Sequence, residues 1–270
     1  WKGESDAQPY IPDMVQKMKD DGFAYVSDNA LVVDVKEDTD TKEVPPCMLL
    51  KSDGASLYTT TDLATIVERM KLYNPDEIIY VVDKRQEMHF IQVFRCARKC
   101  GLVTDETGLK FLGFGTMNGK DGKPFKTRDG GVMRLEYLLK DINEEMLKKI
   151  EASRPMDEEE AEKISKIVGL SAVKYGDLSN QASKDYIFDV DRFTSSEGNT
   201  GPYILYTIVR IKSILRKYEE MGGTAGDGQI TASANESEKA LQLELTKFNS
   251  VMETAYEESA QIGRASCRER

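Results

Sequence analysis

The chain has 270 residues, 40% of them hydrophobic, with 37 basic and 47 acidic side chains and a net charge of -10. This size and apolar content allow a substantial core and about two domains. The acidic balance excludes nucleic-acid binding through a diffuse positive field, so any such contact has to come from local basic patches. No apolar run approaches the roughly 18 residues of a membrane span, and we expect a cytoplasmic protein with no membrane partner.

The cysteines are sparse and irregularly spaced: Cys47, Cys96, Cys100 and Cys267. Cys96 and Cys100 are one helical turn apart, which is not the spacing of a zinc ribbon. We therefore expect reduced core thiols and no metal site. The chain begins at Trp1 rather than at Met, so we expect it to be a piece of a longer protein.

Strand and helix patterns alternate through the first 114 residues. We expect helices over 13–20, 60–70 and 86–100, and strands over 30–35, 47–51, 77–82 and 110–114. This alternation predicts an α/β fold with a parallel sheet. Ligands of such sheets lie at the carboxyl ends of the strands. We therefore expect convergence on one crevice by the segments that follow the strands: 53–62, 83–89 and 116–131.

The stretch from Gly113 to Gly131 combines a strand end, two turn dipeptides and a basic loop. The turns are at Asn118-Gly119 and Asp121-Gly122, both of which are strong turn signals. The segment Lys126-Thr127-Arg128 follows, in which one cation lies on each side of the threonine hydroxyl. Such a loop can neutralise phosphate charge in a phosphoryl-type transition state. An exposed hairpin with solvated charges is the alternative.

Helical patterns dominate after residue 134. Stripes of apolar residues predict helices over 135–150, from 156–160 onward, over 202–221 and over 241–256. Residues 186–190 are expected to be extended. Residues 222–237 are rich in small residues and predict a linker. Residues 263–270 fit no pattern and are expected to be a non-native tail.

Two places in the first half carry residues suited to ligand binding. Tyr58 and Asp62 flank a strand-to-helix turn, where a carboxylate can clamp a guanidinium through two parallel hydrogen bonds. The alternative is that Asp62 only caps its helix. His89 is the only histidine and lies three residues after Gln86. It is either a catalytic group or a structural hydrogen-bonding group, and no Walker A or complete GxGxxG motif is present.

Five sequence blocks in a fixed order then carry a resemblance to a known family. The blocks are Gly3-Glu4-Ser5 with Pro9-Tyr10-Ile11-Pro12; Asp53 to Ala64 (DGASLYTTTDLA); Gln86 with His89-Phe90; Gly119 to Arg128 (GKDGKPFKTR); and Gly198 to Tyr203 (GNTGPY) with Tyr206 and Arg210. They extend over roughly residues 3–262. With these blocks the chain resembles the arginyl-tRNA synthetases, which are class I aminoacyl-tRNA synthetases.

The resemblance implies a fold and a domain order. It implies the second half of a Rossmann-like parallel-sheet catalytic domain, followed by an incomplete α-helical anticodon-binding domain. The implied boundaries are 1–133 for the catalytic part, 134–200 for a helical connection and 201–262 for the start of the anticodon-binding domain. The implied function is ATP-dependent attachment of arginine to tRNA(Arg) through arginyl-adenylate, with Mg²⁺ accompanying ATP and with no DNA partner.

The resemblance also implies roles for individual residues. Substrate arginine would be held by three of them: Tyr58, Asp62 and Gln86. ATP would be bound by four: His89, Lys126, Thr127 and Arg128. Tyr203 and Tyr206 would contact tRNA, which is consistent with the stacking of bases on tyrosine rings.

The sequence departs from the family pattern in two ways. The signature loop reads Phe-Lys-Thr-Arg-Asp-Gly in place of Lys-Met-Ser-Lys-Ser. No His-x-Gly-His element occurs in the chain, and in class I enzymes this element lies in the first half of the nucleotide fold. We therefore expect a fragment that lacks the N-terminal part and the C-terminal end and is inactive alone. A non-catalytic tRNA-binding or structural fragment is the alternative function.

Overall fold

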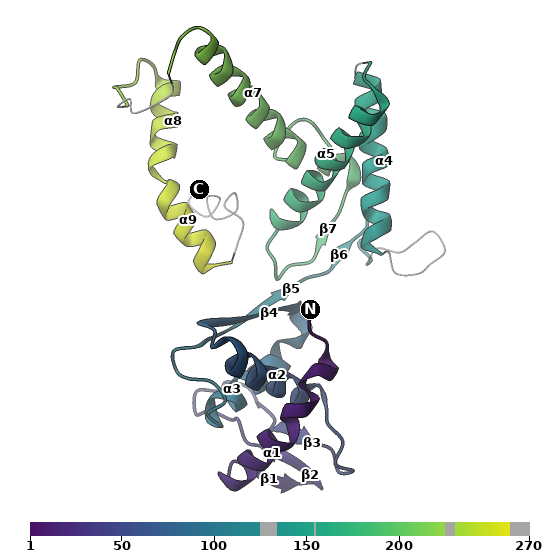
Figure 1. Cartoon of the computed structure of the whole chain (residues 1–270), viewed down its shortest axis with the longest axis vertical. Coiled ribbons are helices and arrows are strands. Elements are labelled where there is room, and N and C mark those ends of the chain that lie inside the picture. The colour runs from purple at the N-terminus through teal and green to yellow at the C-terminus, as the bar shows by residue number, and fades with distance from the viewer. Residues whose placement is uncertain (125–133, 154, 225–229, 260–270) are drawn as a thin grey trace. The chain divides into compact units, whose positions relative to one another are not determined.

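The computed structural model describes residues 1–124, 134–153, 155–224 and 230–259 (Figure 1). The chain divides into two compact units, Trp1–Phe114 and Gly115–Arg270. The first unit mixes strands and helices, and the second is mainly helical.

Unit 1 begins with a 3-10 helix and a helix and continues with strands and helices. Its elements are η1 (Glu4–Tyr10), α1 (Ile11–Asp20), β1 (Ala24–Ser27), β2 (Ala30–Val33), β3 (Cys47–Leu50), α2 (Tyr58–Tyr73), β4 (Glu77–Asp83), η2 (Lys84–Gln86), α3 (Glu87–Lys99) and β5 (Gly108–Phe114). All of the helices and strands predicted for this half are present, and β1 was not predicted.

The strands β1, β2 and β3 form an antiparallel sheet, not part of a parallel one. Asp28 and Asn29 link β1 to β2, and both have positive φ (49° and 62°), as a two-residue hairpin turn requires. A connection this short permits only antiparallel pairing. The expectation that the strand at 47–51 joins the parallel sheet is wrong, because it pairs antiparallel with β2. The Asp28-Asn29 turn was the overlooked signal for the pairing of β1 with β2.

The strands β4 and β5 are parallel and in continuous register from Glu77↔Gly108 to Asp83↔Phe114. Helix α3 lies between them in the sequence and supplies the crossover that parallel pairing needs. The predicted parallel α/β unit is confirmed for this pair. The carboxyl end of β4 leads directly into η2 and α3, so this strand positions the start of α3.

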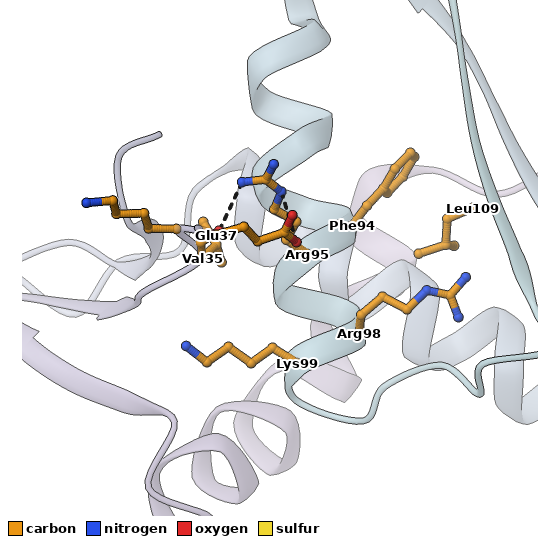
Figure 2. A pocket seen from close by; sticks show the side chains of 8 residues that line it. Val35, Glu37, Phe94, Arg95, Arg98, Lys99 and Leu109 are labelled. Carbon is orange, nitrogen blue, oxygen red and sulfur yellow. Dashed lines mark hydrogen bonds and ion pairs between the residues drawn. The ribbon is translucent and has the colours of Figure 1, made fainter. Parts of the chain in front are cut away.

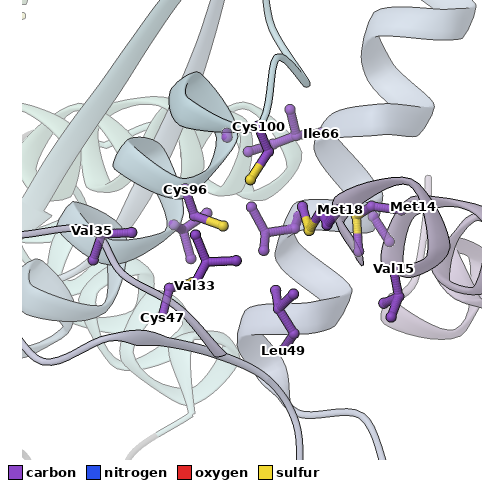
Figure 3. Close-up of a cluster of buried hydrophobic side chains, with 14 of the residues drawn as sticks. Met14, Val15, Met18, Val33, Val35, Cys47, Leu49, Ile66, Cys96 and Cys100 are labelled. Atoms are coloured by element: carbon purple, nitrogen blue, oxygen red, sulfur yellow. The ribbon is translucent and has the colours of Figure 1, made fainter. Parts of the chain in front are cut away.

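One apolar core joins the helices of unit 1 to both of its sheets. Figure 3 shows the part of this core that lies between the three helices and the strands β2 and β3. Three thiols lie in this core, and we call them the core cysteines: Cys47, Cys96 and Cys100. The neighbouring thiol of Cys96, followed by burial, raises the pKa of Cys100. The prediction of reduced core thiols is confirmed for these three, and Cys267 lies outside the described residues.

Unit 2 has two short strands and a set of helices. Its elements are β6 (Met117–Asn118), α4 (Leu135–Ser153), α5 (Glu158–Leu178), β7 (Tyr186–Ile187), α6 (Val190–Phe193), α7 (Gly201–Glu220), α8 (Glu236–Thr246) and α9 (Phe248–Glu257). Helices α4 and α5 lie side by side (Figure 1). The expected single helix over 241–256 is in fact the pair α8 and α9, with Lys247 between them.

The core of unit 2 is small and lies where α4 and α5 meet the segment from β7 to α6. Its buried side chains are Leu138, Ile142, Met146, Val173, Phe188 and Phe193. Helix α7 approaches α5 closely at Gly201, where a Cβ atom would lie 2.2 Å from the carbonyl oxygen of Ser171. Glycine is therefore needed at the first residue of α7. Among the described residues, no helix combines the length and apolarity of a membrane span.

Candidate active site

The start of α2 is fixed to strand β3 by a buried hydroxyl. Thr60 Oγ1 donates to the carbonyl oxygen of Leu49 and accepts from the backbone N–H of Leu57 at 2.8 Å. Thr60 has no exposed surface. Because it joins the helix to the sheet two residues before Asp62, this side chain sets where the Asp62 carboxylate lies.

The start of α3 is fixed by the end of β4. Asp83 accepts hydrogen bonds from the backbone N–H and the guanidinium of Arg85, with the shortest distance 2.6 Å. The Arg85 side chain, followed by its backbone N–H, lowers the pKa of Asp83 to about 2. The residue before α3 is Gln86 and the third residue of the helix is His89, so this turn determines where the imidazole points.

The two helix starts meet through a direct contact between Asp62 and His89. His89 Nε2 lies 2.6 Å from Asp62 Oδ2, and the two side chains are 24% and 30% exposed. A carboxylate can only accept hydrogen bonds, so the ring nitrogen donates. Two of the three segments that were expected to converge, 53–62 and 83–89, therefore meet through this contact. The pair is partly open to solvent, and a ligand can therefore reach it.

Tyr58 and Gln86 flank this pair without joining it. Tyr58 is one turn before Asp62 on α2 and is 75% exposed. Gln86 is exposed and lies one turn before His89. In the part of the chain that the structure describes, neither side chain forms a hydrogen bond to Asp62 or His89. The four predicted residues thus lie at the starts of two packed helices, with two of them in contact and two exposed.

Tyr80 is a residue of this region that the sequence did not single out. It is 8% exposed, and its hydroxyl is buried without a hydrogen-bond partner among the described residues. Burial, with a smaller contribution from the nearby Asp62 charge, raises the pKa of Tyr80 to about 12 against the opposing effect of Arg69. The phenol therefore keeps its proton near the carboxylate. Tyr80 carries the only side-chain hydroxyl in the apolar strand β4, and this feature of the sequence could have identified it.

The predicted phosphate loop, Lys126-Thr127-Arg128, lies outside the described residues. The turn before it is visible, with the N–H of Gly119 donating to the carbonyl of Lys123 at 2.8 Å. Lys120, at this turn, has an exposed side chain that also forms two ion pairs. Its ammonium lies 3.2 Å from Asp189 and 3.1 Å from Asp191, so it ties the turn to the start of α6.

Helix α7 presents the two predicted tRNA contacts. Tyr203 and Tyr206 are 42% and 54% exposed, and the guanidinium of Arg210 lies 5.7 Å from the centre of the Tyr206 ring. Thr200 caps the helix by accepting from the N–H of Tyr203. An exposed aromatic ring beside a cation is a suitable surface for a stacked base.

A surface hollow of about 540 Å³ lies beside the second half of α3, lined mainly by charged side chains (Figure 2). Arg95 forms two hydrogen bonds to Asp40, at 2.9 and 2.7 Å. Arg98 donates to the carbonyls of the turn before β5, and Lys99 donates to the carbonyl of Asp34. These cations serve the protein's own acceptors, so the hollow is a poor candidate for an anion site.

Two known protein-family models match the sequence of this chain. Residues 1–190 match the family model for the catalytic domain of class I (R) tRNA synthetases. The chain belongs to this tRNA synthetase family. Residues 204–262 match the model of the DALR anticodon binding domain, which includes most of α7 and all of α8 and α9. The predicted resemblance and fold class are confirmed.

Curated relatives of this class I (R) tRNA synthetase chain are arginine–tRNA ligases. One from Agathobacter rectalis is 69% identical over 268 residues, covering 96% of this chain and 45% of the relative. One from Alkaliphilus oremlandii is 56% identical, covering 95% of this chain and 43% of the relative. The chain therefore spans a little under half the length of these curated relatives.

Solved structures show the same fold at low sequence identity. The arginyl-tRNA synthetase of Plasmodium falciparum aligns with a TM-score of 0.74 and 24% identity, covering 95% of this chain and 43% of that one. The Thermus thermophilus enzyme aligns with a TM-score of 0.73 and 20% identity, covering 97% and 50%. The backbone arrangement of the synthetase family is thus preserved.

Proposed function

We propose that this chain is part of an arginine–tRNA ligase and carries the site that selects arginine. The observation that supports this most strongly is the carboxylate of Asp62, which is partly exposed at a junction of two helix starts and within a family-matched catalytic domain. A guanidinium is planar and always charged, and it matches a carboxylate in a two-point hydrogen bond. Tyr58 and Gln86 would complete the arginine site.

The proposed reaction has two steps. The carboxylate of arginine attacks the α-phosphate of ATP, giving arginyl-adenylate and releasing pyrophosphate. The arginyl group then passes to the terminal adenosine of tRNA(Arg). Lys126, Thr127 and Arg128 would stabilise the charge on the departing pyrophosphate. Mg²⁺ would be bound chiefly through the ATP phosphates, which commonly supply its ligands together with water.

The proposed domain division follows from the same family. Residues 1–133 would form the catalytic part, 134–200 a helical connection and 201–262 the start of the anticodon-binding domain, with 263–270 a non-native tail. Tyr203 and Tyr206 would stack against tRNA bases. Matches to both a catalytic and an anticodon-binding model favour a ligase over a module that only binds tRNA.

Arginine-dependent exchange of pyrophosphate with ATP tests the function in the complete protein to which this chain belongs. The wild type is expected to exchange with arginine and not with lysine. Asp62→Ala is expected to raise the KM for arginine by about 100-fold or more, because a substrate charge loses its partner. Asp13→Ala, at an exposed acid on α1, is the control and leaves the KM unchanged. Exchange that did not depend on arginine would refute the proposal.

A further inference from the structure

The contact between Asp62 and His89 assigns the two carboxylate oxygens different surroundings. Oδ2 accepts from His89 Nε2 at 2.6 Å. Oδ1 has no hydrogen-bond donor among the residues that the structure describes. A carboxylate has about four lone-pair positions, and the imidazole occupies one of them. The remaining positions are sufficient for a guanidinium to bind through two N–H groups.

The imidazole of His89 is itself held in place by the ring of Phe90. Its ring meets the ring of Phe90 edge-on, with centroids 5.0 Å apart and an interplanar angle of 83°. Phe90 is 3% exposed and packs against Tyr80, Phe94 and Phe111. The aromatic core of unit 1 therefore fixes the histidine, and the histidine in turn restricts the rotation of the Asp62 carboxylate.

Without a hydrogen-bond partner, the side chain of Asp62 would be free to rotate about its side-chain bonds. Asp62 is the fifth residue of α2 and does not cap that helix. The N-cap residue is Leu57, and its backbone N–H donates to Thr60 Oγ1 instead. A side chain that is ordered before the ligand arrives does not lose its rotational entropy on binding. The hydrogen bond from His89 supplies this ordering from a second helix.

We propose that His89 is a positioning residue that holds the Asp62 carboxylate in the orientation that receives the guanidinium of arginine. This inference rests on the proposed function and replaces the expectation that His89 contacts ATP. The imidazole touches the carboxylate and not the substrate. Its loss should therefore weaken arginine binding and leave ATP binding unchanged.

The contact itself can be tested on the 270-residue chain. His89 is the only histidine, so its imidazole signals in a ¹⁵N NMR spectrum need no assignment. We expect an Nε2–H proton that exchanges slowly with water and that is lost in Asp62→Ala, which leaves no acceptor at this position. Asp13→Asn, at an exposed acid on α1, is the control and should leave the signal in place. An imidazole signal unaffected by Asp62→Ala would overturn the proposal.

The role is tested in the complete protein by pyrophosphate exchange with His89→Ala and His89→Gln. A glutamine amide can place a donor near the position of Nε2, whereas alanine cannot. We expect His89→Ala to raise the KM for arginine about 10-fold with less than a 2-fold change in the KM for ATP, and His89→Gln to restore most of the loss. A 10-fold change corresponds to about 1.4 kcal/mol.

A double mutant separates positioning from a general structural effect. In an Asp62→Asn background, His89→Ala should raise the KM for arginine no further, because the carboxylate that it positions is gone. Additive effects, or a rise confined to the KM for ATP, would overturn the proposal. A wild type without arginine-dependent exchange would refute the proposed function instead, and the NMR result would still report on the contact.

Discussion

Thr60→Val removes one hydroxyl and keeps the shape of the side chain. The hydroxyl forms two hydrogen bonds, one to the carbonyl of Leu49 in β3 and one from the N–H of Leu57 before α2. Valine can form neither. Because Thr60 is completely buried, water cannot replace the lost hydroxyl. The two backbone groups are therefore left without a hydrogen-bond partner.

The magnitude follows from those two groups. A buried polar group that loses its partner costs about 1–3 kcal/mol. Leu49 is fully buried and Leu57 is half-buried, so we expect the free energy of unfolding of unit 1 to fall by about 2–4 kcal/mol. Thr60→Ser keeps the hydroxyl and loses one methyl group, which costs about 1 kcal/mol.

Urea denaturation of the 270-residue chain, followed by far-UV circular dichroism, measures this difference. Thr60→Val should unfold at a clearly lower urea concentration than Thr60→Ser, with the same dependence on denaturant. In the complete protein, Thr60→Val should also raise the KM for arginine, because α2 carries Asp62. If the valine variant proved as stable as the serine variant, the hydroxyl would not anchor α2 to the sheet.

Three further predictions concern other parts of the molecule. In unit 2, Phe188→Ala should lower the free energy of unfolding by about 3–5 kcal/mol, whereas Ile187→Ala, at its exposed neighbour on β7, should change it by less than about 1 kcal/mol in the same urea titration. Arg95→Gln removes the guanidinium that lowers the pKa of Asp40 from its ordinary value of 3.8, and carboxyl-detected NMR should show that pKa rising. The variant's loss of stability should be fully present above the ordinary pKa and should fade as the pH falls from there through the lowered pKa that Asp40 has in the wild type. In a Cys267→Ser background, the core cysteines should react with a thiol reagent at least about 100-fold more slowly in the native chain than in urea, and rapid native labelling would contradict their burial.

The sequence predicted the parallel pair β4 and β5 because an unbroken apolar run and a helix of crossover length leave few alternatives. It failed for β1 to β3, where pairing depends on a two-residue turn, Asp28-Asn29, whose positive φ values are visible only in the structure. The helix pattern over 241–256 also concealed a break at Lys247, since apolar periodicity continues through a single non-helical residue.

The sequence predicted the location of the candidate site but not the contacts between its side chains. Sequence position put Asp62 and His89 at the starts of two helices, and the fold was expected to bring those starts together. Periodicity does not specify which side chains then touch. The direct hydrogen bond between the two, and the buried hydroxyl of Tyr80 beside them, depend on how α2 packs against α3 and on where β4 ends.

The central claim is that the Asp62 carboxylate selects the charged guanidinium of arginine. Citrulline has nearly the same shape and no charge, so comparing the two substrates in pyrophosphate exchange, with wild type and Asp62→Asn in the complete protein, tests the claim most directly. We expect the wild type to prefer arginine by a kcat/KM ratio of about 100-fold or more, since mispairing a buried charge costs several kcal/mol. Asp62→Asn should remove most of that preference, chiefly by raising the KM for arginine. A preference that survived in Asp62→Asn would contradict the account.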